Sequence, residues 1–218
     1  MSDREPPANG LTDWREWHEE YADPESGLSW RRRAVQDRVR AFLDSRPGPV
    51  RVVSACAGEG RDLLEVLAER PHDAARVSGR LVELDPDLAA TARQFVADLG
   101  VDLEVVQGDA GSTDSYAGAV PADYVMLCGV FGNITDEDIH RTVLAVPTLM
   151  SPGAHVVWTR GLFETDLAQT IATWFEASGF ERTSYHADDD HGHRVVEHRL
   201  VADPRPFRPG EQLFTFVR

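Results

Sequence analysis

The sequence predicts an α/β protein built on a doubly wound, mostly parallel sheet. Three observations support this: short apolar runs alternate with helix-like segments, glycines directly follow the first run, and 218 residues at 42% hydrophobic content suit one such domain. Strands are expected at 50–55, 79–84, 102–107, 122–127 and 153–159. Helices are expected at 60–70, 86–99, 135–149 and 166–178, with a short helical turn near 112–118.

The two ends of the chain differ from this alternating middle. Residues 1–10 are expected to form a flexible tail, and residues 11–47 an N-terminal helical lid with helices at 11–22 and 29–45. The main domain is then expected over 48–218. Its last part changes character, with extended segments at 180–187 and 194–201 and a final strand at 213–217.

Charge and composition exclude several classes of function. The net charge is −15, and an acidic protein repels phosphate backbones, so a nucleic-acid partner is not expected. The polar N-terminus has no apolar signal-peptide core, and no run approaches the roughly 18 apolar residues of a membrane span. The two cysteines, Cys56 and Cys128, form no CxxC motif, so a reducing cytoplasm is expected. Arginine far in excess of lysine favours a bacterial source.

The most informative stretch of the chain is a strand, a tight turn and a helix start at 50–67. The apolar run ends in small residues and two glycines, Gly58 and Gly60, and only a loop poor in side chains lets its backbone approach a ligand closely. The spacing matches neither the lysine-containing phosphate loop nor the dinucleotide pattern, because Leu63 stands where a third glycine belongs. A loop that binds a nucleoside without a polyphosphate fits better; a turn that serves packing alone is the alternative.

Acidic or small residues also follow the next three strands. Glu83 lies 23 residues after Gly60, near the distance at which an acid reaches ribose hydroxyls, and a carboxylate can accept from both hydroxyls of a diol. Asp109 follows the third strand and can accept from an adenine amino group. The fourth strand ends at Cys128. Because the carboxyl ends of parallel strands form the ligand crevice of an open sheet, these residues predict a binding site there.

Taken together, these motifs resemble those of class I S-adenosylmethionine-dependent methyltransferases, over roughly residues 48–180. The resemblance implies a Rossmann-like domain at 48–218, S-adenosyl-L-methionine as the cofactor, and a seven-stranded sheet that closes with an antiparallel strand at its edge. Ser54 replaces the acid that often opens the first motif, so the partner of the methionine amino group stays open. The resemblance implies cofactor contacts from Ala55, Ala57, Gly58, Gly60, Glu83, Leu84, Gly108, Asp109, Ala110, Cys128 and Phe131.

The acceptor side of the site is less well defined. Methyl transfer is an in-line displacement in which alignment contributes most, and a base is needed only for a protonated acceptor. Phe131 and Asn133 are expected to face the acceptor; the alternatives are a core position for Phe131 and a turn role for Asn133. Cys128 at a strand end could act as a nucleophile, but a buried small residue is the favoured interpretation.

An N-terminal aromatic cluster is the second candidate for the acceptor side. Its members share one helix face and, with the segment 128–134, look like a group of small bacterial methyltransferase-like proteins of undefined substrate. They either dock a helix on the core or form a lid in which His18 or Tyr21 accepts a proton. The cluster comprises Trp14, Trp17, His18 and Tyr21.

We therefore expect methyl transfer to a small-molecule acceptor, without a nucleic-acid or membrane partner; a homodimer is left open. The same cofactor could instead serve cyclisation or aminopropyl transfer, or the chain could be a non-catalytic binding module. An NAD-dependent oxidoreductase is disfavoured by the missing third glycine. No metal site is expected, because the histidines at 186, 191, 193 and 198 are interpreted as belonging to a solvated hairpin loop, and the arginines at 31–33 as solvated too.

Overall fold

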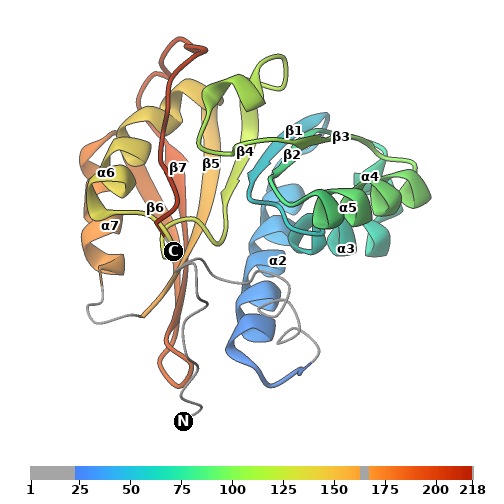
Figure 1. The fold of residues 1–218 in the computed structure, drawn as a ribbon, viewed down its shortest axis with the longest axis horizontal. Helices are drawn as coiled ribbons and strands as arrows, with labels where there is room; N and C mark the ends of the chain where they lie inside the picture. The colour runs from blue at the N-terminus through green and yellow to red at the C-terminus, as the bar shows by residue number, and fades with distance from the viewer. Residues whose placement is uncertain (1–22, 163–166, 218) are drawn as a thin grey trace.

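The protein folds into a seven-stranded sheet with helices on both of its faces (Figure 1). The computed structural model describes residues 23–162 and 167–217. The strands are β1 (Val50–Ala55), β2 (Val77–Glu83), β3 (Asp102–Gln107), β4 (Ala122–Leu127), β5 (Met150–Gly161), β6 (Phe180–Asp188) and β7 (His193–Leu200). The helices are α2 (Gly27–Ser45), α3 (Arg61–Glu69), α4 (Pro71–Ala74), α5 (Pro86–Leu99), η2 (Thr113–Tyr116), α6 (Asp136–Ala145), η3 (Val146–Leu149) and α7 (Ala168–Ala177).

The order of the strands brings the carboxyl ends of the first three together. The sheet runs β3-β2-β1-β4-β5-β7-β6; β1 to β5 are mutually parallel, and β7 is antiparallel to both of its neighbours. The register pairs Ala55 with Val82 and Glu83 with Gln107, so β1, β2 and β3 end at the same edge. The predicted doubly wound, mostly parallel sheet is confirmed, but the antiparallel strand β7 lies between β5 and β6 rather than at the edge, which β6 occupies.

Polar caps and prolines determine where the helices begin and end. The Thr135 hydroxyl accepts from the Asp138 backbone N–H and so caps the start of α6. Asp85 caps α5 in the same way, with Pro86 at the first helical position. The helix expected over 135–149 is interrupted at η3, where Pro147 lacks a backbone donor.

Helices α2, α3 and α5 cover one face of the sheet, and α6 and α7 cover the other (Figure 1). A doubly wound sheet would be expected to carry a helix between β3 and β4 on the α6–α7 face, but the chain forms only the four-residue η2 there. Residues 202–217, here called the C-terminal strap, fill this position and run beside α6 toward the carboxyl edge (Figure 1). Leu213 and Phe214 of the strap are buried in the same core as Trp158 and Phe175.

Three sequence predictions outside the site are wrong. Residues 213–217 form no strand; the strap meets η2 through a single isolated bridge between Gln212 and Ser112. His198 is not in a solvated loop but fully buried on β7, where its Nδ1 accepts from Trp158 Nε1 at 3.2 Å. Arg31 is only 6% exposed, because α2 turns it toward the sheet.

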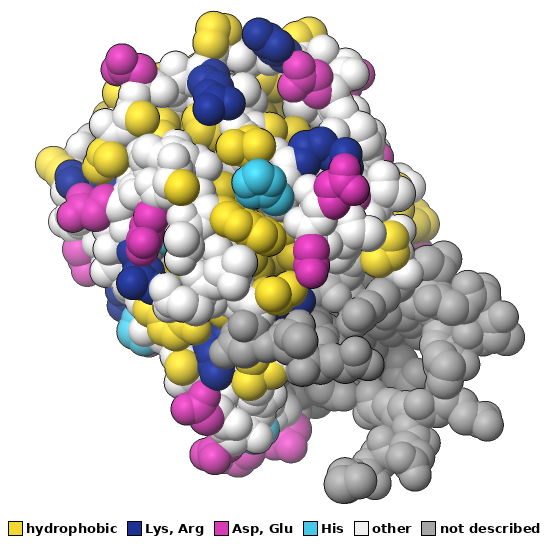
Figure 2. Space-filling model, turned by 90° about the vertical axis from the view of Figure 1, so that its left-hand side faces the viewer, with side chains coloured by type: hydrophobic (Ala, Val, Ile, Leu, Met, Phe, Trp, Pro, Cys, Tyr) yellow, Lys and Arg dark blue, Asp and Glu magenta, His cyan; other side chains and the backbone are white. Residues whose placement is uncertain are grey.

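The surface over α6 and α7 mixes both signs of charge. Figure 2 shows basic and acidic side chains interspersed with hydrophobic ones on this face, without a continuous basic area among the residues described there. Within 23–162 and 167–217, no helix is both long and apolar enough to cross a membrane. The same ranges contain no group of three or more metal-ligating side chains placed to hold an ion.

Candidate functional site

The loop after β1 folds back tightly on the carboxyl edge of the sheet. Cys56, Gly58 and Gly60 all have positive φ, at 53°, 56° and 78°. Glycine adopts this conformation readily, whereas a residue with a Cβ pays about 1–2 kcal/mol for it. Gly60 also needs to be small, since a Cβ there would lie 2.7 Å from Leu64 Cδ1 of α3. The two glycines therefore serve the turn and the packing of α3.

The backbone donors of this loop are engaged within the protein. The Ala57 N–H donates to Val82 O at 3.0 Å, and the Gly60 N–H to Ala57 O at 2.8 Å. The Gly58 N–H donates to the Glu83 carboxylate at 2.7 Å. These hydrogen bonds give the predicted loop residues a role in closing the loop, and Ala55 itself is a core residue, 2% exposed.

Glu83 is the central side chain of the carboxyl edge. It ends β2, is 9% exposed, and accepts from Gly58 N at 2.7 Å through Oε2 and from Asp85 N at 2.9 Å through Oε1. Hydrogen bonds to a charged acceptor are worth roughly 1.5–3 kcal/mol each, which accounts for a carboxylate at this burial. Each oxygen keeps a further lone pair for a ligand donor. The next residue, Leu84, is 62% exposed and places an apolar side chain at the rim.

Asp109 lies one strand further along the same edge. The Gly108 N–H donates to Glu83 O at 3.0 Å, which ties the ends of β2 and β3 together. The exposed Asp109 carboxylate accepts from Gly111 N at 2.7 Å and from Gln212 Nε2 at 2.9 Å. Ala110 is buried, and its carbonyl oxygen accepts from the Tyr116 hydroxyl at 2.6 Å, which anchors the loop that carries Asp109.

Cys128 presents its thiol to the α2–α3 side of the sheet. Burial, and then the Asp62 carboxylate, raise the pKa of the Cys128 thiol well above its ordinary value, while Arg31 opposes this shift. Burial, with Glu83 and Asp109, likewise raises the pKa of Cys56. Both thiols stay protonated at neutral pH, so neither is poised as a nucleophile.

The two residues expected to face an acceptor lie in different surroundings. Phe131 is fully buried against Trp158 and Phe175, with ring centroids 5.7 and 6.3 Å away, so its predicted contact with cofactor or acceptor is corrected to a core position. Asn133 is half-buried, and its Nδ2 donates to Gly129 O at 2.7 Å. Its main chain also holds the end of the strap, because the Val217 N–H donates to Asn133 O at 2.9 Å. His18 and Tyr21, with the rest of the aromatic cluster, lie outside the described residues.

Several residues near this edge were not predicted as site residues from the sequence. Arg31 of α2 and Asp62 of α3 lie 3.6 Å apart beside Cys128. In the methyltransferase loop pattern, acid-x-Gly-x-Gly-x-Gly, Ser54 stands at the acid and Cys56 at the first glycine. That position was the available signal for the positive φ of Cys56. Nothing in the sequence near Gln212 indicates its contact with Asp109, because 103 positions separate the two residues.

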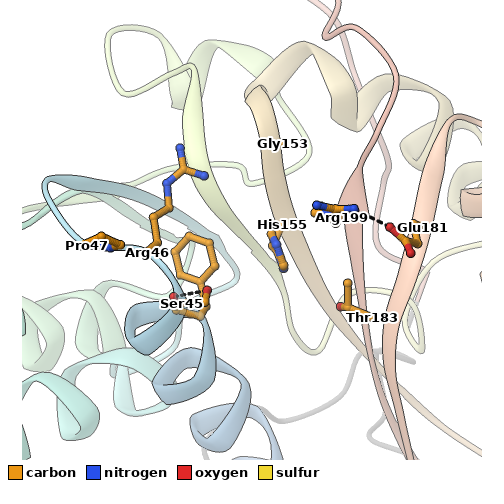
Figure 3. A pocket seen from close by; sticks show the side chains of 9 residues that line it. Ser45, Arg46, Pro47, Gly153, His155, Glu181, Thr183 and Arg199 are labelled. Atoms are coloured by element: carbon orange, nitrogen blue, oxygen red, sulfur yellow. Dashed lines mark hydrogen bonds and ion pairs between the residues drawn. The ribbon is translucent and has the colours of Figure 1, made fainter.

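A hollow of about 530 Å³ opens at the opposite edge, around the start of β5 and the end of α2 (Figure 3). Its basic side chains are matched by acids: Arg46 pairs with Asp123 at 2.7 Å and Arg199 with Glu181 at 2.6 Å. It lies at the amino ends of the parallel strands, far along the sheet from Glu83. The carboxyl edge, where the motif residues meet, is therefore the candidate site.

Comparison with known proteins identifies the fold. No family model and no curated protein matches the chain. Magnesium protoporphyrin IX methyltransferase (ChlM) from Synechocystis PCC 6803, solved with bound SAM, superposes with a TM-score of 0.65 at 14% identity, over 87% of this chain and 91% of that one. This is the fold of the class I S-adenosylmethionine-dependent methyltransferases.

Two further structures with the methyltransferase fold widen this comparison. An O-methyltransferase family protein from Burkholderia thailandensis has a TM-score of 0.59 at 16% identity, over 78% of this chain and 57% of that one. The [4+2]-cyclase SpnF has a TM-score of 0.56 at 13% identity, over 79% of this chain and 81% of that one. The fold is thus shared by proteins whose names describe different reactions.

The described residues of this methyltransferase fold suit an adenosyl sulfonium. Glu83 supplies a buried carboxylate with lone pairs left for a diol, and Leu84 supplies exposed apolar surface next to it. Asp109, in the loop after the neighbouring strand β3, supplies a second acceptor. Arg31 and Asp62 carry opposite charges, as do the carboxylate and amino groups of a methionine moiety.

Proposed function

We propose that the protein transfers a methyl group from S-adenosylmethionine to a small-molecule acceptor. The observation that carries the proposal is the hydrogen bond from Gly58 N to Glu83 Oε2 at 2.7 Å, with Asp109 in the loop that follows the adjacent strand β3. It joins the glycine loop to the predicted ribose acid at the carboxyl edge, which is the ligand-binding edge of open parallel sheets. The likeness to ChlM, solved with SAM, supports the same assignment.

Each residue in the proposed cofactor site has a distinct task. Glu83 accepts from the ribose hydroxyls, and Asp109 accepts from the adenine amino group. Leu84 packs on an apolar face of the nucleoside. When bound, S-adenosylmethionine supplies an electrophilic methyl group on its sulfonium.

Alignment and exclusion of water are the tasks of the acceptor side. The Asn133 side-chain amide neither gains nor loses a proton near neutral pH. It can therefore orient an acceptor by hydrogen bonding but cannot act as a general base. We propose that Asn133 and the loop after β4 hold the acceptor against the methyl group, where positioning can lower the barrier by roughly 7–11 kcal/mol in favourable systems. His18 or Tyr21 would take up a proton if the acceptor carries one.

A small acceptor is favoured over a nucleic acid by electrostatics. The net charge of −15 repels phosphate backbones, and the described residues seen in Figure 2 carry scattered charges of both signs without a continuous basic area. SpnF, named as a [4+2]-cyclase and of the same fold, supports one alternative: a reaction other than methyl transfer.

Labelled cofactor tests these candidates together. The purified protein is incubated with methyl-labelled S-adenosylmethionine and the small-molecule fraction of a cell extract. Label in a small product, with formation of S-adenosylhomocysteine, supports methyl transfer. Labelled methylthioadenosine indicates the aminopropyl-type alternative, in which this cofactor transfers its 3-amino-3-carboxypropyl group. Unlabelled, rearranged product with intact cofactor indicates a cyclase. Calorimetry that detects no binding of S-adenosylmethionine would refute all three reactions and leave a non-catalytic binding module of other specificity.

A further inference from the structure

The C-terminal strap contributes a side chain to the candidate adenine site. Gln212 Nε2 donates to Asp109 Oδ2 at 2.9 Å and to Phe214 O at 2.7 Å. The other carboxylate oxygen, Oδ1, accepts from the Gly111 N–H at 2.7 Å. The Asp109 carboxylate is thus held from two sides, by its own loop and by a segment from the far end of the chain.

Backbone hydrogen bonds fix the strap where this contact requires it. The Leu213 N–H donates to Gly111 O at 2.7 Å, and the Thr113 N–H donates to Glu211 O at 2.9 Å, so both neighbours of Gln212 are tied to the loop after β3. A Cβ on Gly111 would lie 2.2 Å from Phe214 O. The approach is therefore close enough that only glycine allows it.

Helix α6 holds the strap from its other side. Arg141 Nε and the Thr142 hydroxyl donate to Leu213 O, at 3.1 and 3.2 Å, and the Thr215 N–H donates to Asp138 Oδ2 at 3.0 Å. Gln212 therefore projects from a backbone that is fixed on both sides, although its own side chain is exposed.

An exposed aspartate without such contacts can rotate among several side-chain conformations, and holding one of them costs free energy when a ligand binds. Two donors select one conformation before binding. A carboxylate has about four lone-pair sites, so two remain for an incoming amino group. The orientation of Asp109 decides whether these lone pairs point to the ligand.

We propose that Gln212 is a positioning residue for adenine recognition: it acts through Asp109 and makes the site selective for a 6-amino purine. This inference rests on the proposed function, because it requires an adenosyl ligand at Asp109. A role for Gln212 in strap docking alone predicts a loss of stability without any change in base selectivity.

Base selectivity distinguishes these roles. We would measure Kd by calorimetry for S-adenosylhomocysteine and for S-inosylhomocysteine, in which a 6-oxo group replaces the 6-amino donor. The Gln212→Met variant keeps the length of the side chain and removes its donor. Gln94→Met is the matched control, since Gln94 Nε2 donates to Asp98 at 2.7 Å on the exposed side of α5. Gln212→Lys restores a donor to Asp109.

The wild type is expected to prefer the adenosyl compound. Gln212→Met should raise its Kd roughly five- to tenfold and reduce the preference over the inosyl compound by a similar factor. Gln94→Met should change neither, and Gln212→Lys should recover most of the preference. An unchanged preference in folded Gln212→Met overturns this inference alone. If Gln212→Met does not fold, loss of the preference in Gln212→Lys overturns it. A wild type that binds neither compound overturns the proposed function as well.

Discussion

Replacing Glu83 by glutamine tests the centre of the candidate site with almost no change in volume. The wild-type carboxylate accepts from two backbone donors, Gly58 N at 2.7 Å and Asp85 N at 2.9 Å. A glutamine amide has one oxygen, so it can satisfy only one of them, and its NH₂ group must face the other N–H. A buried donor left without an acceptor costs about 1–3 kcal/mol, and we expect this loss in the free energy of unfolding of the ligand-free protein.

The same substitution also removes charge from the proposed ribose contact. Losing a hydrogen bond to a charged acceptor, worth roughly 1.5–3 kcal/mol, should raise the Kd for S-adenosylhomocysteine by at least about tenfold. Calorimetry measures the affinity and urea denaturation the stability. Glu104→Gln is the matched control on β3: its carboxylate pairs with Arg80 at 2.6 Å, but the side chain is 61% exposed, and such surface pairs contribute about 0–1 kcal/mol.

The two measurements separate a ligand-binding role from a structural one. Reduced stability with reduced affinity agrees with the proposed site. Reduced stability with an affinity within twofold of wild type would show that Glu83 only closes the glycine loop, and the ribose assignment would be wrong.

Three further predictions concern the folded protein itself. Cys56 has φ 53°, which glycine tolerates, so Cys56→Gly should be more stable to urea than Cys56→Ala by about 1 kcal/mol; equal stability would contradict the strain argument. Gly111→Ala should lower the free energy of unfolding, measured in urea, by about 1–3 kcal/mol because the new Cβ would lie 2.2 Å from a strap carbonyl oxygen. Gly108→Ala should lower it less, because the Cβ there would lie 3.3 Å from its nearest neighbour, a hydroxyl oxygen. Burial, and then Arg182, lower the pKa of His198 to about 3. The unfolded chain therefore binds a proton between pH 6.5 and 3 that the folded chain does not, and stability should fall by up to roughly 1.4 kcal/mol per pH unit as the pH drops through this range. His198→Gln should show a flatter dependence in urea titrations at several pH values, and identical slopes would refute the assignment.

Local chemistry made the sheet and its binding edge predictable. β1, β3 and β4 lie at the predicted residues, because short apolar runs bounded by turn residues suit few other structures. The position of Glu83 beside the glycine loop followed from the parallel register, which brings strand ends to one edge. Thr135 marked the start of α6 for the same local reason, whereas the interruption at Pro147 was not predicted.

Predictions for single side chains failed where a distant segment decides the environment. Phe131 follows β4, as an acceptor-facing residue would. In the structure, however, Trp158 and Phe175 pack against it, and the sequence near Phe131 gives no indication of these contacts. His198 lies close in sequence to the exposed His191, yet β7 buries it between a tryptophan and α7.

By itself, the sequence determined an α/β sheet whose carboxyl edge holds a glycine loop and two acids, because strand period, turn chemistry and helix caps act over a few residues. The tertiary structure alone decided that the C-terminal strap replaces a helix between β3 and β4 and brings Gln212 to Asp109. That contact spans 103 positions, and its stability depends on packing against α6 rather than on any local preference of the strap.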